Sequence, residues 1–217
     1  MLEGEVQMLE LNHALADVLG GDKTVFVGIA APLRSVSPEY AKLNLLDYSA
    51  NESFLVRNAQ ATAEGALAEL IVHVPRTVCG SQILITGCGR ITRSLAPMLR
   101  TLGAEVAVAA RRPSDRAWVT SQGMEALTFP KAIRRAKDFE IVINTVPAPV
   151  IDHRFLDHLP SGAAIMDLAS LPGGVDTEAC QKRDIQAWRA LGLPGQYAPL
   201  TAAKIIKDTV MLMLEEE

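Results

Sequence analysis

Cysteines, long apolar stretches and an excess of basic residues are scarce or missing in this chain of 217 residues. Its three cysteines, Cys79, Cys88 and Cys180, are too few and too scattered for a disulfide framework or a zinc site. No apolar run reaches the roughly 18 residues of a membrane span, and the acidic N-terminus MLEGEVQMLE lacks the apolar core of a secretory signal. The net charge of −4, without a long basic run, argues against a nucleic-acid partner. We therefore expect a cytoplasmic protein with no membrane and no nucleic-acid partner.

Two kinds of catalytic site are also not indicated. The four histidines lack the spacing of metal ligands, so no metal centre is expected. The Gly-x-Ser-x-Gly turn of one hydrolase class is absent. What remains is an ordinary globular composition, with 49% hydrophobic and 21% charged residues.

A glycine-rich turn between an apolar strand and a helix is the most informative feature present. The run Ile83-Leu84-Ile85 leads into Gly87-Cys88-Gly89, a helical segment follows, and a second strand runs from Val106 to Ala110. The first glycine permits a tight turn, and the second lets the backbone approach a pyrophosphate at the helix N-terminus. This context predicts a dinucleotide site, although a plain strand–helix–strand core unit would share the pattern. The predicted cofactor-binding residues of the turn are Gly87, Gly89, Arg90 and Ile91.

The end of the second strand indicates which dinucleotide binds. An NAD site places Asp or Glu about 20 residues after the glycines, where the carboxylate binds the ribose 2′-hydroxyl. Here that position reads Ala109, Ala110, Arg111, Arg112, with Ser114 close behind. Two guanidinium groups and a hydroxyl suit a 2′-phosphate, so Arg111, Arg112 and Ser114 predict NADP as the cofactor.

Two residues depart from the usual glycine fingerprint. Thr92 stands at the third glycine position, where close packing of helix on strand prefers Gly or Ala. Pro97 lies inside the expected helix, where it removes a backbone donor. Cys88, inside the turn, is interpreted as a small packing residue rather than a nucleophile.

From Gly80 onward, strands and helices alternate. The pattern predicts strands at 82–86, 105–110, 141–144, 163–168 and 185–189, with helices near 90–102, 114–122, 130–137 and 152–158. This rhythm predicts an α/β fold, a doubly wound parallel Rossmann-type sheet with its ligand at the carboxyl ends of the strands. We expect the NADP-binding Rossmann domain to span 79–192.

The first part of the chain has a different pattern. Strands are expected at 24–29 and 43–48, and helices at 11–19 and 62–74. Two strands are few for a stable sheet, so a second, smaller and apparently truncated α/β domain is expected, its missing strands coming from another chain or a longer N-terminus. The amphipathic helix 201–217 is predicted to pack on it. The substrate-side domain would then comprise 1–78 plus 193–217.

Polar side chains follow two of the predicted strands. Asn144, Thr145 and Pro147 come directly after the third strand, where a cofactor ribose or nicotinamide would lie, although a polar strand exit closed by Pro147 explains them equally well. Asp167 and Ser170 follow the fourth strand; a carboxylate there either fixes its own loop or faces the nicotinamide. All five are candidate cofactor-binding residues.

Two further polar segments are candidates for substrate binding. In the first, Asn58 and Thr62 are expected where an extended segment becomes a helix, so that they and free N–H groups would meet a substrate carboxylate. Simple helix capping is the alternative. In the second, Thr201 opens the last helix after a proline-rich loop. The candidate catalytic residues are Asn58, Thr62, Glu64 and Thr201.

Together, these segments resemble a known family. The strings NAQATAEGALAELI, GCGRITRSLA, INTVPAPVI, IMDLASLPGGVD and LPGQYAPLTAAKII are similar, in order and spacing, to the A subunit of dipicolinate synthase over about residues 45–210. The family is longer at its N-terminus, and its members carry Lys and Gly around the last motif, where this chain has Leu200 and Ala203.

The resemblance implies an NADP-linked oxidation of dihydrodipicolinate, or of its hydrated precursor, to pyridine-2,6-dicarboxylate in the lysine-biosynthesis branch of spore formers. It also implies a partner, a flavoprotein-like B subunit, and a homo-oligomer is expected. Arg57 or Lys204 would then serve as counter-charges for the dicarboxylate. Another NADP dehydrogenase of similar layout, or a non-catalytic NADP-binding or partner-docking module, remains an alternative.

Overall fold

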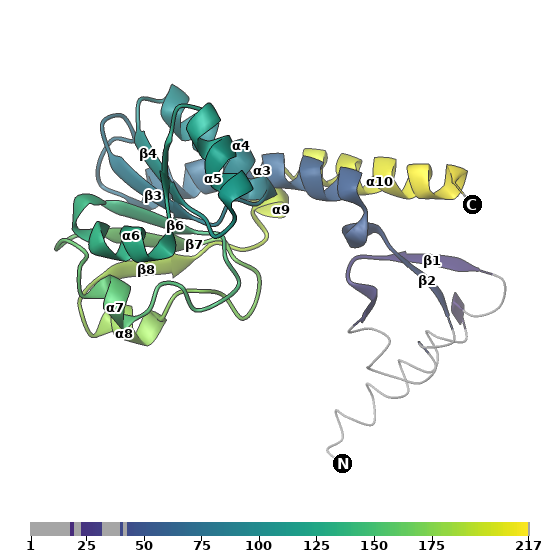
Figure 1. Ribbon diagram of the computed structural model, residues 1–217. Helices are drawn as coiled ribbons and strands as arrows, with labels where there is room; N and C mark the ends of the chain where they lie inside the picture. Colours follow the sequence, from purple (N-terminus) through teal and green to yellow (C-terminus); the bar gives the residue numbers. More distant parts are fainter. Residues whose placement is uncertain (1–17, 20–22, 32–39, 41–42, 217) are drawn as a thin grey trace, which may run out of the picture. The chain divides into compact units, whose positions relative to one another are not determined.

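The computed structural model describes residues 18–19, 23–31, 40 and 43–216 (Figure 1). The chain divides into two compact units, Met1–Arg57 with Ala203–Glu217, and Asn58–Ala202. Two helices, α3 (Glu52–His73) and α10 (Pro199–Glu215), contribute residues to both.

The larger unit is built on a six-stranded parallel sheet of order β5-β4-β3-β6-β7-β8. All strands are parallel to their neighbours, and the register pairs Ile83 with Val106 and with Ile141 at the centre. The chain starts at the middle strand, winds outward to one side and then returns to wind to the other. This order confirms the predicted doubly wound Rossmann-type sheet. The strands are β3 (Gln82–Thr86), β4 (Glu105–Ala109), β5 (Glu125–Leu127), β6 (Ile141–Asn144), β7 (Ala164–Asp167) and β8 (Gln186–Arg189).

Helices cover both faces of this sheet (Figure 1). Since side chains alternate along a strand, Ile83 and Ile85 join the core on one face and Leu84 joins the core on the other. The first face is covered by α3 together with α4 (Arg90–Thr101), α5 (Pro113–Ser121) and α9 (Leu193–Tyr197). The second is covered by α6 (Phe129–Arg134), α7 (His153–Leu156) and α8 (Thr177–Gln181). The sheet core is thus buried on both sides, as parallel sheets require.

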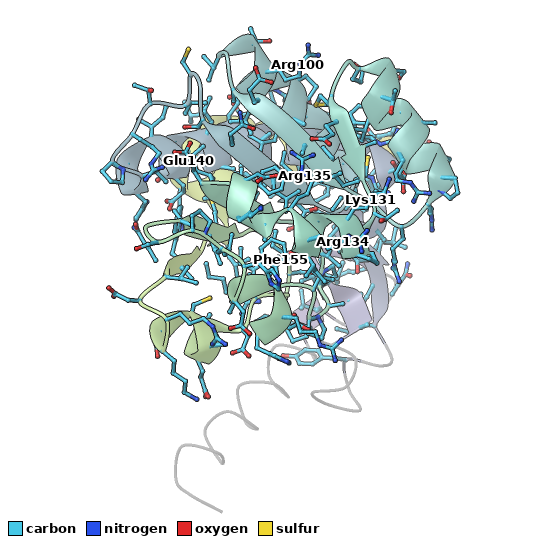
Figure 2. The ribbon with its side chains drawn as sticks, turned by 60° about the vertical axis from the view of Figure 1, so that its left-hand side comes forward. Arg100, Lys131, Arg134, Arg135, Glu140 and Phe155 are labelled. Atoms are coloured by element: carbon cyan, nitrogen blue, oxygen red, sulfur yellow. The ribbon has the colours of Figure 1, made fainter. Side chains whose placement is uncertain are left out.

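The helix α6 carries the basic residues Lys131 and Arg134, and Arg135 follows as its C-cap; all three are labelled in Figure 2. Arg135 forms ion pairs with Glu125 and, at 2.8 Å, with Asp138. Its guanidinium also lies 5.7 Å from the ring centre of Phe139. This arginine therefore has a structural role.

The smaller unit contains a two-stranded parallel sheet of β1 (Thr24–Val27) and β2 (Asn44–Asp47). Asp47 accepts hydrogen bonds from the backbone N–H groups of Ile29 and Ala30 and from the hydroxyl of Ser49. Partial burial raises the pKa of Asp47, but these hydrogen bonds outweigh it and bring the pKa to about 2.

Most predicted elements are confirmed. The helices α8 and α9 were not predicted, and two further differences have physical reasons. The strand β5 was not predicted because its three residues, EAL, are too few to show alternation. The helix α3 begins at Glu52 rather than at Thr62, because the Asn51 side chain accepts hydrogen bonds from Ser53 N and Phe54 N and starts the helix there. The predicted helix 11–19 lies almost wholly outside the described residues.

The predicted domain bounds at 78/79 and 192/193 differ from the bounds of the compact units, 57/58 and 202/203. The reason is that Ala63, Ala66, Leu70 and Val74 belong to the sheet core. That 79–192 and the remaining segments fold as independent domains stays a prediction. None of the helices in the described part of the chain is long and apolar enough to cross a membrane.

Candidate functional site

The glycine turn lies at the carboxyl end of the central strand β3. Gly87 has φ +92°, and a Cβ there would be 2.5 Å from the Oγ1 of Thr145. Glycine is needed at this position both for the left-handed backbone and for the close approach of the two loops. Gly89 is the N-cap of α4, and a Cβ added to it would meet no atom within 4 Å. Open space therefore lies beside the first backbone N–H groups of α4, where a phosphate would be favoured.

Thr92 replaces the third glycine by making hydrogen bonds rather than by leaving space. Its side chain is buried, its hydroxyl donates to the Gly87 carbonyl at 3.1 Å, and it lies 3.2 Å from the Thr145 hydroxyl. Thr145 in turn donates to the Thr86 carbonyl at 2.7 Å. The two hydroxyls therefore tie α4, the glycine turn and the exit of β6 together. Thr92 is compatible with the fingerprint, and α4 continues through Pro97.

The Cys88 side chain is partly buried and packs against the core beside the turn. Burial raises its pKa above the usual 9.0 and the Asp115 carboxylate adds to the effect, whereas Arg93 opposes it. A protonated thiol is a poor nucleophile at neutral pH, which agrees with the packing role predicted for Cys88.

A hollow of about 500 Å³ opens at the carboxyl ends of β4, β5 and β6. Its walls include Ala110 and Arg111 after β4, Thr128 and Phe129 after β5, and Val146 after β6. Its lining also includes Arg116 of α5, with Pro130, Ile133, Ala148, Pro149, Val150 and Asp152. This is the edge of a doubly wound sheet at which ligands bind.

Three candidate residues follow β4 in the chain, and one of them, Arg111, lines this hollow. Arg111, Arg112 and Ser114 are exposed. Within the described residues, neither Arg111 nor Arg112 forms an ion pair. The Asp115 carboxylate next to them is paired with Arg93 at 3.3 Å. The positive charge at this edge is therefore available to an anion.

Arg116 was not among the residues predicted for the site. Its Nη1 donates to the carbonyls of Ala110 and Arg111, at 3.0 and 2.5 Å. The sequence signal was its position in the second turn of α5, because helical side chains lean toward the N-terminus and cover the preceding loop.

The candidate residues Asn144 and Asp167 form a buried hydrogen-bond network. Asn144 has 0% exposure, and its Nδ2 donates to Asp167 Oδ1 at 2.7 Å and to the Val146 carbonyl at 3.0 Å. Its Oδ1 accepts from Thr86 Oγ1 at 2.7 Å and from Val146 N at 3.1 Å. All the hydrogen-bonding capacity of the amide is used within the protein. Its link to Asp167 joins the ends of β6 and β7.

The Asp167 carboxylate also shapes the loop after β7. It accepts hydrogen bonds from Ala169 N at 3.1 Å and from Gly174 N at 3.2 Å. A Cβ at Gly174 would be 2.3 Å from the Val146 carbonyl oxygen, so only glycine lets this loop lie against the loop after β6. These contacts support a structural role for Asp167, in which its carboxylate fixes its own loop. Ser170 and Pro147, in the two loops, are exposed.

The predicted substrate residues lie in two helices. Asn58 and Thr62 are within α3, and the Thr62 hydroxyl donates to the Asn58 carbonyl at 2.7 Å. The expectation that they stand beside free N–H groups at a helix start is wrong, because α3 begins at Glu52. Glu64 accepts a hydrogen bond from Gln60 on the surface of α3. Thr201 does lie in the first turn of α10 and is exposed.

In the described ranges of the chain, the contacts of the predicted substrate residues do not link them to the glycine turn. No hydrogen bond or ion pair joins Asn58, Thr62 or Thr201 to the glycine turn within the part of the chain that the structure describes. Arg57, expected as a substrate counter-charge, donates to Asp208 at 2.7 Å and lowers the pKa of that carboxyl.

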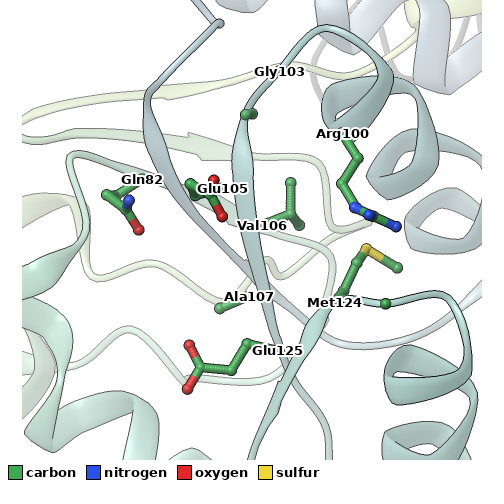
Figure 3. Close-up of a pocket in the computed structure, with 10 residues that line it drawn as sticks. Gln82, Arg100, Gly103, Glu105, Val106, Ala107, Met124 and Glu125 are labelled. Atoms are coloured by element: carbon green, nitrogen blue, oxygen red, sulfur yellow. The ribbon is translucent and has the colours of Figure 1, made fainter.

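A second hollow, of about 410 Å³, lies at the opposite edge of the sheet (Figure 3). Gln82, Glu105 and Glu125 stand at the amino ends of their strands, and Arg100 lies across from them. Ligands of doubly wound sheets bind at the carboxyl edge instead, so this hollow is not a candidate for the dinucleotide.

Comparison with known proteins identifies the family. The chain is 33% identical over 193 residues to the A subunit of dipicolinate synthase from Bacillus subtilis, a match of 88% of this chain and 65% of that protein. The crystal structure of the corresponding A subunit from Bacillus halodurans superposes with a TM-score of 0.84 at 33% identity, over 90% of this chain and 67% of that one. The chain belongs to the family of dipicolinate synthase A subunits.

Family membership confirms the resemblance drawn from the motifs, and the chain spans 65% of the length of the Bacillus subtilis protein. A comparison with models of protein families found no match. The transhydrogenase of Sinorhizobium meliloti shares the fold at a TM-score of 0.76 and 16% identity, over 89% of this chain and 68% of that one. This member of the dipicolinate synthase family thus has a dehydrogenase-like Rossmann fold.

Proposed function

We propose that this chain is an NADP-dependent oxidoreductase that acts as a dipicolinate synthase A subunit. The choice of NADP as cofactor rests on the charge at the end of β4. At the carboxyl end of β4, where an NAD site would place a carboxylate, the chain presents Arg111 and Arg112 without ion-pair partners among the described residues. An unneutralised positive charge at that position favours a 2′-phosphate.

The residues at this edge fit the cofactor. The open space at Gly89 and the left-handed backbone at Gly87 suit a pyrophosphate at the start of α4. Arg90 and Ile91, the first residues of α4, would lie beside it, and Ser114 would add a hydroxyl near the 2′-phosphate. The hollow beside Phe129 would hold the adenosine. When bound, NADP would supply a two-electron acceptor.

The proposed reaction is the oxidation of dihydrodipicolinate to dipicolinate. The substrate ring would lose a hydride to oxidised NADP and a proton to solvent, giving dipicolinate, NADPH and H⁺. Because the product ring is aromatic, proton loss is favourable and needs no strong base, which suits a site whose proposed residues include no histidine. Placing the ring against the cofactor would then be the main contribution of the protein.

For the substrate we propose the surface presented by Asn58, Thr62, Glu64 and Thr201, facing the loops that carry Thr145, Pro147 and Ser170. The support for this location is the exposed first turn of α10, which offers backbone N–H groups to a carboxylate. Asn144 and Asp167 would contribute by shaping the loops after β6 and β7. The proposed partners are a second copy of the chain and a flavoprotein-like B subunit.

Turnover tests the proposal directly. The chain, alone and with a B subunit, would be incubated with freshly generated dihydrodipicolinate and NADP, and the formation of NADPH and dipicolinate followed together. The expected result is equal amounts of the two products. NADP binding without turnover in either mixture would reduce the function to a cofactor-binding module.

The substrate location has its own test. Thr62→Val should weaken the binding of dipicolinate, used as a probe, and leave NADP affinity unchanged. Thr101→Val is the matched control, because Thr101 makes the same bond to its own helix, with the Pro97 carbonyl at 2.9 Å. Equal effects of the two variants would remove Thr62 from the site.

A further inference from the structure

The side chain of Arg116, in α5, reaches back to the sheet edge where the residue that selects the cofactor lies in related sites. In an NAD site the selecting carboxylate follows the second strand. Here the residues after that strand are Ala110 and Arg111, and the Arg116 guanidinium lies within hydrogen-bond distance of both their carbonyl oxygens, at 3.0 and 2.5 Å. Arg116 also lines the hollow of about 500 Å³ at this edge.

The contacts of Arg116 leave its charge unneutralised. Both acceptors are backbone carbonyls, which carry no net charge, and both are reached by Nη1. Two nearby carboxylates are already engaged: Asp115 pairs with Arg93, and Asp152 accepts the N–H groups of Arg154 and Phe155 at the start of α7. Within the described residues, Nε and Nη2 of Arg116 have no hydrogen-bond partner, so they remain available to a ligand.

We propose that Arg116 is a specificity-determining residue for the 2′-phosphate of NADP. One edge of its guanidinium fixes the turn between β4 and α5, and the other edge presents donors and charge to the phosphate. This dual contact pre-organises the side chain, whereas Arg111 and Arg112 are exposed and must be ordered on binding. The inference rests on the proposed function, since it concerns the same cofactor site.

A purely structural tie makes a different prediction, because it would affect both cofactors alike. The test measures dissociation constants of NADP and NAD by calorimetry for the full chain, for Arg116→Gln, and for Arg134→Gln as the control. Glutamine retains an amide donor for the carbonyls but carries no charge. Arg134 is an exposed arginine of α6 outside the hollow.

With Arg116→Gln, NADP binding should weaken by about ten- to a hundredfold, the loss of a charge-assisted contact, while NAD binding changes less than about threefold. Arg134→Gln should change neither. Adenosine 2′-phosphate, compared with adenosine 5′-phosphate, should show the same selective loss without the nicotinamide half. Should Arg116→Gln unfold, Arg116→Lys keeps the charge and should retain a preference for NADP.

The outcomes separate this inference from the proposed function. If the unaltered chain shows no preference for NADP, both are overturned. If it prefers NADP and Arg116→Gln keeps the full preference, or loses both cofactors equally, the role of Arg116 is overturned and the proposed function stands.

Discussion

Replacing Gly89 by alanine should separate cofactor binding from stability. Gly89 has φ −83° and ψ −168°, a conformation that alanine adopts without strain, and a Cβ there meets no protein atom within 4 Å. Alanine is a poorer N-cap than glycine, but it also restricts the unfolded chain, and these opposing effects keep the change in stability within about 1 kcal/mol. The new methyl group, however, enters the space through which a pyrophosphate would approach the backbone.

Gly87→Ala is the matched comparison, because it should damage both properties. Its Cβ would be 2.5 Å from Thr145 Oγ1 and 2.9 Å from Val146 Cγ2, and its φ of +92° is unfavourable for alanine. The backbone contributes roughly 1–2 kcal/mol and overpacking roughly 1–3 kcal/mol, which together should lower the melting temperature by roughly 5–15 °C.

The assay pairs thermal unfolding with NADP titration for the two variants and the unaltered chain. Gly89→Ala should keep its melting temperature within about 3 °C and lose at least tenfold in NADP affinity, or about 1.4 kcal/mol. A Gly89→Ala variant that binds NADP as tightly as the unaltered chain would refute the placement of the pyrophosphate at α4.

Three further changes probe the packing and charge of the fold. Asn144→Ala leaves its buried partners unsatisfied and should lower the free energy of unfolding by about 3 kcal/mol or more in denaturant titration; a loss below about 1 kcal/mol would contradict the network. Gly174→Ala should cost about 1–3 kcal/mol because its Cβ meets the Val146 carbonyl, while Gly195→Ala, with open space around it, should be neutral; equal melting temperatures would be inconsistent with this packing. Since the pKa of Asp47 is about 2 when folded against 3.8 unfolded, its contribution is complete above pH 3.8 and lost as the pH falls toward 2. Asp47→Asn should therefore flatten the acid side of the stability profile, and an unchanged profile would argue against the Ile29–Ala30 contacts.

The sheet could be predicted from the sequence because its signals are local. Apolar runs gave the limits of β3, which lies between Gly80 and Gly87, and of β6, which ends shortly before Pro147, without error. The short strand β5 was missed, since Glu125, Ala126 and Leu127 form a strand only by pairing with β4. That pairing is a tertiary effect, which three residues do not encode locally.

The site was predictable where chemistry follows from strand order. Parallel strands end at one edge, so the glycine turn, Arg111, Thr145 and Asp167 were correctly expected at the same edge. Their separate roles were not predictable. Only the contacts show that Asn144 uses all its donors and acceptors within the protein, or that Thr92 replaces a glycine by bonding to the Gly87 carbonyl.

The position of the substrate residues Asn58 and Thr62 in their helix was not predicted correctly. The helix was predicted only from Thr62, from the apolar face formed by Leu67, Leu70 and Ile71, and the capping signal of Asn51 was not recognised. The N-terminus of the helix was therefore expected at Thr62, ten residues after its actual position at Glu52. Arg116 was missed because its importance comes from two backbone carbonyls rather than from a recognisable motif.

The preference of the unaltered chain for NADP over NAD decides whether the edge beside β4 binds a 2′-phosphate. Equilibrium titration of both cofactors should give a dissociation constant for NADP that is about ten- to a hundredfold lower, as expected for charge-assisted phosphate contacts. Raising the salt concentration should narrow the difference, because exposed charges such as Arg111 and Arg112 are screened. Equal affinities for the two cofactors at low salt would show that Arg111 and Arg112 do not form a 2′-phosphate site.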